Sequence, residues 1–482
     1  MTEVTDPIRR RTFLSQTGIG FGSLAAASLW ADEQRKHDVQ PKSQPGLASG
    51  VVGPLAPPHF PARVRRVIFL YMAGGPSHLE TFDYKPTLDR LDGQPMPTSF
   101  TENQPIAQLQ GQTLKVQGHL TKFAQYGESG TWISDFLPFH QQIADKICVI
   151  KSMVTEQINH DPAHTFMNTG TAISGRPAMG SWITYGLGSE SDSLPGFVVM
   201  TSVGGRNPQP IAARQWSAGF IPSRFQGVEF SSSGDPVNYV SNPPGVERVL
   251  QSKLIETVRS LDEHRNRWID DPEIATRISA YELAFKMQAS IPDLVDMSDE
   301  PQHILKMYGA KPGDGSFASN CLLARRMAER GVRFIQLYHR GWDHHGDLVR
   351  YMNTCCGLTD QPTAALVNDL SQRGMLDDTL IIWGGEFGRT PMFQGKGGPG
   401  RDHHIKGFSM WLAGGGIRPG YYGETDELGY NSVHNITHVR DLHATMLHML
   451  GIDHQRLSVK YQGLNMRLTG VEPAKILTGV LA

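Results

Sequence analysis

Strand-length runs of apolar residues recur along the chain and alternate with helical patterns that end at a glycine. The runs are nearly continuous in apolar side chains, which is typical of strands buried on both faces of a sheet, and they cover residues 64–71, 147–152, 332–338, 379–383 and 408–413. Helical spacing that ends at Gly331, Gly374 and Gly451 covers residues 321–330, 359–373 and 441–450. This alternation predicts an α/β fold, with a mostly parallel central sheet and helices on both of its faces.

Residues 246–297 interrupt this order with a highly charged stretch. Apolar positions recur there at helical spacing, at Leu250, Leu254, Val258 and Leu261. The pattern predicts a helical hairpin inserted into a single α/β domain of residues 63–482. We expect this insertion to be a packing element with a solvated outer face rather than a catalytic one.

The first residues resemble an export signal rather than part of the fold. Three arginines, Arg9 to Arg11, precede a short stretch at residues 18–29 that is apolar but rich in glycine, serine and alanine. A basic tail that binds anionic lipid or nucleic acid is the alternative interpretation. We expect residues 1–31 to be a twin-arginine signal and residues 32–62, which are polar and proline-rich, to be a linker. The protein is then periplasmic or otherwise extracytoplasmic, and it contacts a membrane only if the signal stays uncleaved.

Composition narrows the class of protein. The formal net charge is −2 and charged residues make up 19% of the chain, so nothing indicates a nucleic-acid partner. Four cysteines in 482 residues do not make a disulfide scaffold, and the fold must rest on its core. Histidine stands out, with 19 residues, many of them in a few polar clusters. Composition leaves the oligomeric state open.

Four polar clusters directly follow runs that have the character of buried strands. They are AGGPSH at residues 73–78, INHDPAH at 158–164, GWDHHGD at 341–347 and GGEFGRT at 384–390. In an open α/β sheet, ligands and metals bind at the carboxyl ends of the parallel strands. We therefore expect the clusters to converge on one site, and this convergence favours an enzyme.

Aspartate and histidine in and near these clusters predict a metal site. Asp343 and His345 follow one strand, and His403 and His404 lie in a glycine-rich loop before another. A lone histidine is more often structural, but two Asp-His-His triplets at strand edges favour a divalent cation. Zinc suits this mixture best, with calcium, manganese and magnesium as alternatives.

Two further clusters add candidate ligands. His160 and His164 are four residues apart, so a helix opened by Pro162 would present both imidazoles on one face near its N-terminus. Glu386 is the only acid in its loop and would join them, while Arg389 could bind a tetrahedral oxyanion in a bidentate manner. A structural pair of Glu386 with Arg389 is the alternative interpretation.

The remaining polar residues of the clusters are candidates for substrate binding. Gly74 and Gly75 would let the backbone approach a ligand closely just before Ser77 and His78. We assign Ser77, His78 and His344 to contacts with the substrate.

The order of these clusters resembles the alkaline-phosphatase-like superfamily, which includes sulfatases, phosphomutases and phosphodiesterases. The chain is similar above all to the sulfatase-related family called domain of unknown function 1501. The shared signatures span nearly the whole mature chain, and they are GGPSHLETFDYKP, INHDPAHTFMNTG, GWDHHGD, GGEFGRTP, GRDHH and FSMWLAGGGIRPG. The resemblance implies the superfamily's α/β fold and a metal site in which Asp343 pairs with His345, while His403 or His404 supplies the last histidine.

The nucleophile region departs from the superfamily pattern. Sulfatases place a cysteine or serine where this chain has His160 and an arginine where it has His164. Ala73 stands where the superfamily has an aspartate, and Phe387 where it has a histidine. A formylglycine or phosphoserine mechanism is therefore not supported. His160 is then a metal ligand, the nucleophile itself, or a sign that catalysis has been lost.

These observations predict an exported, metal-dependent hydrolase of sulfate or phosphate esters, acting on a small-molecule or glycan ester. Its catalytic residues are His160 and Arg389, and its metal ligands are Asp343, His345, Glu386, His403, His404 and His164. The alternative is a non-catalytic exported binding protein that keeps the superfamily's anion and metal pocket. A redox partner ranks below both, because the chain has no cysteine or haem signature for one.

Overall fold

The computed structural model describes residues 53–482, apart from residues 56, 206–207, 238–246, 270–271 and 396. The twin-arginine motif and most of the linker expected at residues 32–62 lie outside the described residues. Across the described part of the chain, no helix combines the length and the apolar character that crossing a bilayer requires. Helix α6 (Arg248–Ile269) belongs to one compact unit, and residues 50–244 and 271–482 form the other, which carries the sheet.

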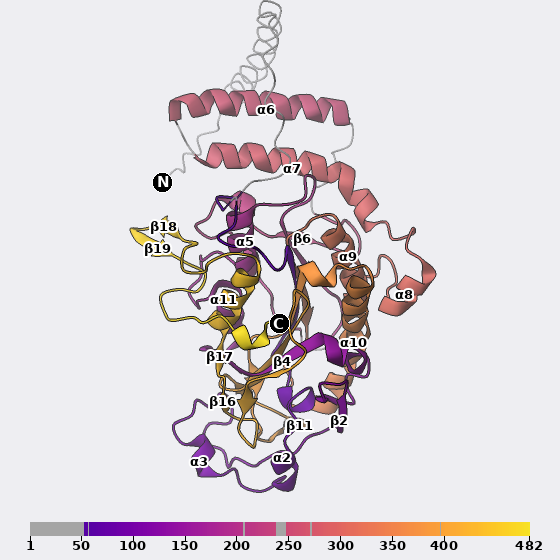
Figure 1. The fold of residues 1–482 in the computed structure, drawn as a ribbon, viewed down its shortest axis with the longest axis vertical. Coiled ribbons are helices and arrows are strands. Elements are labelled where there is room, and N and C mark those ends of the chain that lie inside the picture. Colours follow the sequence, from indigo (N-terminus) through magenta and orange to yellow (C-terminus); the bar gives the residue numbers. More distant parts are fainter. Residues whose placement is uncertain (1–52, 56, 206–207, 238–246, 270–271, 396) are drawn as a thin grey trace, which may run out of the picture. The chain divides into compact units, whose positions relative to one another are not determined.

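A nine-stranded mixed sheet forms the centre of the larger unit, in the order β14-β4-β13-β8-β1-β7-β5-β6 with β17 beside β4 (Figure 1). The strands are β1 (Arg66–Ala73), β4 (Ile147–Val154), β5 (Phe197–Thr201), β6 (Val228–Phe230), β7 (Phe334–Arg340), β8 (Thr379–Gly384), β13 (Phe408–Ala413), β14 (Gly420–Tyr422) and β17 (Thr437–His438). Strands β8, β1, β7, β5 and β6 are mutually parallel, whereas β13 is antiparallel to both of its neighbours.

Strand β1 lies in the middle of the sheet and is buried along its whole length. An unbroken apolar strand of this kind is stable only where both faces of the sheet are covered. Tyr71 of β1 pairs with Tyr338 of β7 on one side and with Gly384 of β8 on the other. The carboxyl ends of these three strands therefore end at the same edge of the sheet.

Helices cover both faces of this sheet and create two hydrophobic cores. The helices are α4 (His160–Thr169), α5 (Met179–Leu187), α7 (Pro272–Val295), α8 (Gln302–Tyr308), α9 (Phe317–Glu329), α10 (Leu348–Gln372) and α11 (Val439–Met449). Figure 1 shows α9 and α10 on one side of the sheet, with α5 and α11 on the other. One core contains Leu322 of α9 and Leu366 of α10, and the other contains Trp182 of α5 and Leu442 of α11.

The predicted α/β class is confirmed, and each predicted apolar run overlaps a strand of the sheet. Strands β5, β6, β14 and β17 were not predicted, because each is only two to five residues long. Strand β13 runs against β8 because the described part of the chain between them contains only two-residue strands, without the helix that a parallel crossover needs. Helices α6 and α7 occupy the stretch predicted to be helical, and α7 buries Met287, Ile291 and Leu294 in the sheet's core.

Candidate metal site

Helix α4 carries two imidazoles at the carboxyl edge of the sheet. It begins at His160 and reaches His164 one turn later, and the two rings stack with their centroids 5.9 Å apart. Pro162 lies in the first turn, where its missing N–H costs no helical hydrogen bond. His160 is consequently at the accessible start of the helix, with 14% of its side chain exposed, whereas His164 is fully buried.

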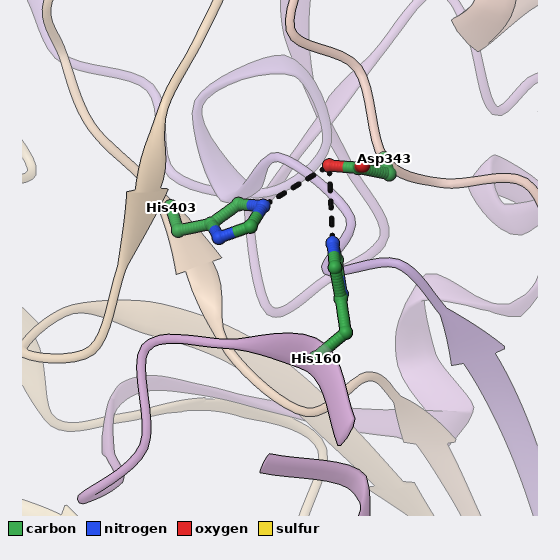
Figure 2. Close-up of side chains that lie close together, drawn as sticks. All are labelled: His160, Asp343 and His403. Carbon is green, nitrogen blue, oxygen red and sulfur yellow. Dashed lines mark hydrogen bonds and ion pairs between the residues drawn. The ribbon is translucent and has the colours of Figure 1, made fainter. Parts of the chain in front are cut away.

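One oxygen of Asp343 is the meeting point of three imidazoles. Asp343 follows β7, and its Oδ1 lies 3.2 Å from Nε2 of His160, 3.1 Å from Nε2 of His403 and 2.9 Å from Nε2 of His345. Figure 2 shows His160 and His403 pointing toward this oxygen from different segments. Histidines that are far apart in the sequence thus meet at one carboxylate beyond the ends of the strands.

Hydrogen bonds indicate which nitrogen of His403 carries its proton. Its Nδ1 lies 2.8 Å from the carbonyl oxygen of Ile158 and can only donate to that acceptor. In the neutral imidazole the other nitrogen, Nε2, then holds a lone pair that faces Asp343 and the other rings.

The same argument applies to His345. Its Nδ1 lies 2.6 Å from Oε1 of Gln394, whose amide nitrogen in turn lies 3.3 Å from Oε1 of Gln108. The amide nitrogen of Gln108 lies 3.2 Å from Nε2 of His345 and donates to it. This closed ring of hydrogen bonds leaves Nε2 of His345 as an acceptor with a lone pair.

His160 completes the pattern through a buried carboxylate. Its Nδ1 lies 2.7 Å from Oε1 of Glu386, and that oxygen also accepts a hydrogen bond from the backbone N–H of Gly74 at 2.9 Å. Nε2 of His160 is buried and makes no hydrogen bond of its own. A histidine that donates one N–H to a carboxylate and aims the other nitrogen at an open position is the usual arrangement of a metal ligand.

The donor set fits a divalent cation. Nε2 of His345 and Nε2 of His403 lie only 3.0 Å apart, so two unprotonated nitrogens are held close together beside a carboxylate oxygen. Donor atoms of His160, Asp343 and His403 all lie within 4.8 Å of one another. Imidazole nitrogen with a carboxylate oxygen is the ligand mixture that zinc takes in proteins, and a cation would relieve the repulsion between the nitrogens.

Burial and neighbouring charge set the protonation of these groups. Burial raises the pKa of Asp343, but Arg389 and the three imidazoles outweigh it and hold that pKa well below its usual range. Burial lowers the pKa of His403 to about 4. At neutral pH Asp343 is therefore ionised and His403 is a neutral imidazole. Burial also lowers the pKa of His160, but Asp343 and Glu386 outweigh it and raise that pKa, so a cation must displace a proton there.

A second group of donors lies deeper in the protein. The two groups cannot both bind a cation, because they share His160. His160, His164 and Glu386 also bring donor atoms within 4.8 Å of one another. A neutral imidazole has a single lone pair, so His160 can serve one group only. His164 and Glu386 are fully buried, and Nδ1 of His164 lies 2.9 Å from the hydroxyl of Tyr71. Asp343 and the accessible histidines are therefore the residues that could hold a cation, with Glu386 and His164 behind them.

Replacing Glu386 with glutamine tests this support. Burial raises the pKa of Glu386, but His164 and His160 outweigh this effect and lower that pKa. The carboxylate is therefore ionised, and it stabilises the proton on Nδ1 of His160. We expect Glu386→Gln to lower zinc affinity by roughly 10- to 100-fold, as removal of such partners usually does. Competition titration with a zinc chelator measures the change. The exposed Glu427→Gln is the matched control, and equal affinity in both variants would contradict the assignment.

Arg389 lies beside the site but is not free to bind an ester, which corrects its expected role. Its side chain is buried, and Nη2 forms an ion pair with Oδ1 of Asp343 at 2.8 Å. Nε donates to the carbonyl oxygen of Gly75 at 2.9 Å, and the other nitrogens donate to carbonyl oxygens of Gly74, Trp342 and Arg401. Arg389 thus ties three strand-end loops together and orients Asp343.

His404 is not brought to the cluster. His403 and His404 form the two-residue strand β12 (His403–His404), which pairs with β9 (Gly388–Arg389). Successive side chains of a strand point to opposite faces, so only one of the two can face Asp343. His404 instead stacks on Tyr430 and its Nε2 lies 2.5 Å from the carbonyl oxygen of that residue. Of the two candidates, the structure places His403 at the site.

The three residues assigned to the substrate are also turned away from the cluster. The hydroxyl of Ser77 bonds to Glu80, and Nε2 of His78 lies 2.8 Å from the carbonyl oxygen of Gly429. His344 is buried, bonds to the carbonyl oxygen of Gly341 at 2.9 Å, and has its pKa lowered by burial to about 3. All three residues stabilise loops around the site rather than facing it.

Sequence reasoning missed the residues that hold these loops. Glu80 and Arg401 form a fully buried ion pair, with Nη2 2.7 Å from Oε1, next to the loop that carries His403. Gln209 donates to Oδ2 of Asp343 at 3.1 Å. Charged residues without a metal-ligand spacing give no signal of this kind, and only the arginine directly before Asp402 could have drawn attention.

The sequence was compared with protein families and with known proteins. The profile described as protein of unknown function (DUF1501) matches residues 64–481, and the chain therefore belongs to this family. A search of curated proteins finds no match.

Several solved structures resemble this one in part. They include a protein in the alkaline phosphatase superfamily from Vibrio parahaemolyticus (12% identity, 86% of this chain and 72% of that chain covered, TM-score 0.32), the lipoteichoic acid synthase LtaP from Listeria monocytogenes (10%, 88% and 78%, 0.33) and the PsFucS1 sulfatase from Pseudoalteromonas sp. (10%, 81% and 68%, 0.33). The function proposed below rests on this chain's own side chains.

Proposed function

We propose that the protein is a metal-dependent hydrolase of sulfate or phosphate esters, in which His160, Asp343 and His403 hold a divalent cation. Zinc is the preferred cation, and calcium, manganese and magnesium are the alternatives. The observation that carries the proposal is the convergence of three Nε2 atoms on Oδ1 of Asp343, each ring having its Nδ1 bonded to an acceptor. Three protein ligands leave one position open, as catalytic zinc sites do. The cation would lower the pKa of a water molecule and polarise the ester.

The charge of the site suits an anionic substrate. Asp343 and Glu386 are carboxylates whose pKa values lie below their usual range, and among the described residues Arg389 is the guanidinium that pairs with this group, through Asp343. The carboxylates exceed the guanidinium by one charge, so a divalent cation leaves the site net positive. In a partly buried site such a charge attracts an anion more strongly than it would in water. The anionic group of a sulfate or phosphate ester would satisfy it.

His345 is the residue that we assign to proton transfer. Its side chain is 13% exposed, close to the 14% of His160 and above the 6% of His403. Its Nε2 lies 2.9 Å from Oδ1 of Asp343, and its lone pair, which accepts from the amide of Gln108, can take a proton when that amide moves aside. An imidazole so placed can take a proton from the attacking water and return one to the leaving alcohol.

A neighbouring cavity gives room for the rest of the substrate. It has a volume of about 380 Å³, lies at the carboxyl ends of β5 and β7, and is lined in part by Ser202, Trp216 and Arg340. Arg340 ends β7, three residues before Asp343. Within the described part of the chain Arg340 has no ion-pair partner, and its buried Nε makes no hydrogen bond. We assign Arg340 to a polar or anionic group of a small-molecule or glycan ester.

Export completes the proposal. The twin-arginine pattern at Arg9 to Arg11 favours transport of the folded protein out of the cytoplasm. Export in a folded state suits a metal site assembled from segments as distant as His160 and His403. The substrate would then be an ester found in the periplasm or outside the cell.

Metal analysis joined to an ester assay tests the function. The purified full chain should contain about one zinc per molecule, and it should cleave aryl sulfate or aryl phosphate esters only while metal is bound. Chelation should abolish turnover and added zinc should restore it. His345→Ala should retain most of the metal and lose at least about 100-fold in kcat, the usual scale of general acid–base catalysis. Full activity in metal-free protein would refute the proposal.

A non-catalytic binding protein is the second candidate. The four cysteines are all buried, and within the described part of the chain the ion pairs and hydrogen bonds of the Asp343 carboxylate involve no serine, threonine or cysteine. This second function predicts metal-dependent binding of sulfate or phosphate esters without turnover. A panel of esters with zinc, manganese, magnesium and calcium distinguishes the two, since measurable affinity with no product in any of them supports the binder.

A further inference from the structure

We propose that the protein has a second ligand site, for an organic anion that carries one ring with an apolar face. The site is a cavity of about 330 Å³ that we call the hairpin pocket. It is bounded by the end of α4, the start of α11 and the hairpin formed by β18 (Val459–Tyr461) and β19 (Leu464–Met466). Thr169 and Gly170 line it, at the opposite end of α4 from His160. At a rise of about 1.5 Å per residue, this is too far for a shared site.

Three arginines from separate segments give the pocket its charge. Arg176, Arg440 and Arg467 line it, opposed by Glu472 alone among the acidic residues. Arg176 and Arg467 are half-buried, and neither has an ion-pair partner in the part of the chain that the structure describes. A half-buried guanidinium without a carboxylate is costly unless an anion satisfies it. The excess of positive charge therefore predicts an anionic ligand.

Arg440 points to the same conclusion by a separate observation. One terminal nitrogen forms an ion pair with Glu156, and the guanidinium lies over the ring of Phe166 at 4.9 Å. Its Nε is buried and makes no hydrogen bond. The side chain is thus held rigidly while one donor stays unused at the pocket wall. A guanidinium in this state is prepared to donate to a carboxylate, sulfate or phosphate oxygen.

Aromatic rings supply an apolar surface for the ligand. Trp182 and Phe220 line the pocket, and their ring centroids lie 6.0 Å apart. Phe220 is stacked on Tyr461 of the hairpin at 4.6 Å, and Arg176 lies over its ring at 5.7 Å. Because Trp182 is buried and Tyr461 is stacked on Phe220, these rings would contact the apolar face of a ligand ring through their edges, while the guanidinium groups hold its charged substituent.

Exposed apolar side chains surround the mouth of the pocket. Leu464 is 63% exposed and Val471 is 85% exposed, and both line the cavity. Two exposed apolar side chains in the lining of one charged cavity add apolar surface for the ring of a ligand. The volume is at the lower end of the range for ligand pockets, so it fits one ring rather than an oligomer. Aromatic acids and sulfated monosaccharides share this chemistry.

Calorimetric titration of the full chain, freed of metal by a chelator so that the metal site neither attracts nor cleaves an ester, tests the pocket with four probes: phenyl sulfate, glucose 6-sulfate, inorganic sulfate and glucose. We expect one ring-bearing anion to bind at one equivalent and to bind more tightly than inorganic sulfate or glucose. Arg467→Gln should weaken that binding about tenfold, as loss of one charged hydrogen bond does. Asn465→Trp should also weaken it, because the indole fills the cavity without changing its charge. Arg456→Gln, an exposed arginine outside the pocket, is the control.

The outcomes distinguish an aromatic acid from a sulfated sugar, and they do not depend on ligand binding at the metal site. Tighter binding of phenyl sulfate indicates an aromatic acid, and tighter binding of glucose 6-sulfate indicates a sulfated sugar. Binding that is equal in wild type, Arg467→Gln and Asn465→Trp would overturn the proposal, as would the absence of binding by either ring-bearing anion. Both variants should keep the metal content and any ester cleavage of the wild type, so a failure here differs from a failure of the hydrolase assignment.

Discussion

Replacing Asp343 with asparagine should remove the metal and also destabilise the fold. Oδ1 of Asp343 is the atom on which the three Nε2 atoms converge, and an amide cannot supply the negative charge that a divalent cation needs. The same oxygen pairs with Arg389, whose side chain is 1% exposed. Without the carboxylate this buried guanidinium keeps only carbonyl acceptors. We expect a loss of about 3 kcal/mol in the free energy of unfolding, at the low end for a broken buried pair.

Two measurements on the same protein check this result. Metal analysis after dialysis should find less zinc in Asp343→Asn than in Glu386→Gln, because a direct ligand is lost rather than its support. Urea unfolding of the metal-free proteins should show the loss of stability without a contribution from bound metal. The exposed Asp377→Asn serves as the control. If Asp343→Asn kept stoichiometric metal, the cation would have to be bound elsewhere in the protein.

Breaking the buried pair of Glu80 and Arg401 should have the largest effect on stability alone. Both side chains are 0% exposed, and Nε and Nη2 of Arg401 donate hydrogen bonds to the two carboxylate oxygens of Glu80. Glu80→Gln leaves the arginine buried with its charge unpaired, which typically costs about 3–5 kcal/mol. The loop that carries His403 directly follows Arg401, so zinc affinity should fall as well.

The pH dependence of stability gives an independent check on this pair. Burial raises the pKa of Glu80, but Arg401 outweighs it and the pKa in the folded protein lies below 4.5. The contribution of Glu80 is therefore complete above the unfolded-state pKa of about 4.5 and is lost as the pH falls through the lower, folded-state pKa. Urea unfolding at several pH values should show this loss in wild type and not in Glu80→Gln. The exposed Glu128→Gln should behave as wild type, and an equally stable Glu80→Gln would contradict the argument.

The apolar pattern predicted the fold well where a strand or helix is long. Strand β1 is a nearly continuous apolar run of strand length, which is typical of a strand buried on both faces of a sheet. The pattern was less informative for β6, a three-residue strand with an exposed glutamate. The direction of β13 also lay outside the pattern, because it depends on how the chain returns from β8 rather than on the strand itself.

At the candidate site, the sequence indicated the types of residue, whereas the structure decided how their side chains are oriented. The sequence placed His160, Asp343 and His345 in strand-end clusters and His403 in a glycine-rich loop, and the structure brings these residues together. It could not show that His404 faces the other way, since its neighbour has the same chemistry and only the pairing of β12 with β9 decides between them. Nor could it show that Arg389 is fully engaged by carbonyl oxygens from three loops.

The sequence by itself determined the class of fold and the kinds of atom available at the edge of the sheet. Hydrophobic periodicity and residue type are local properties, and they are encoded at each position. Only the tertiary structure decided which nitrogen of each imidazole is free, which carboxylate supports His160, and which charges are buried as pairs. These depend on neighbours that are distant in the sequence, and the energy of a buried polar group depends on whether such a neighbour is present.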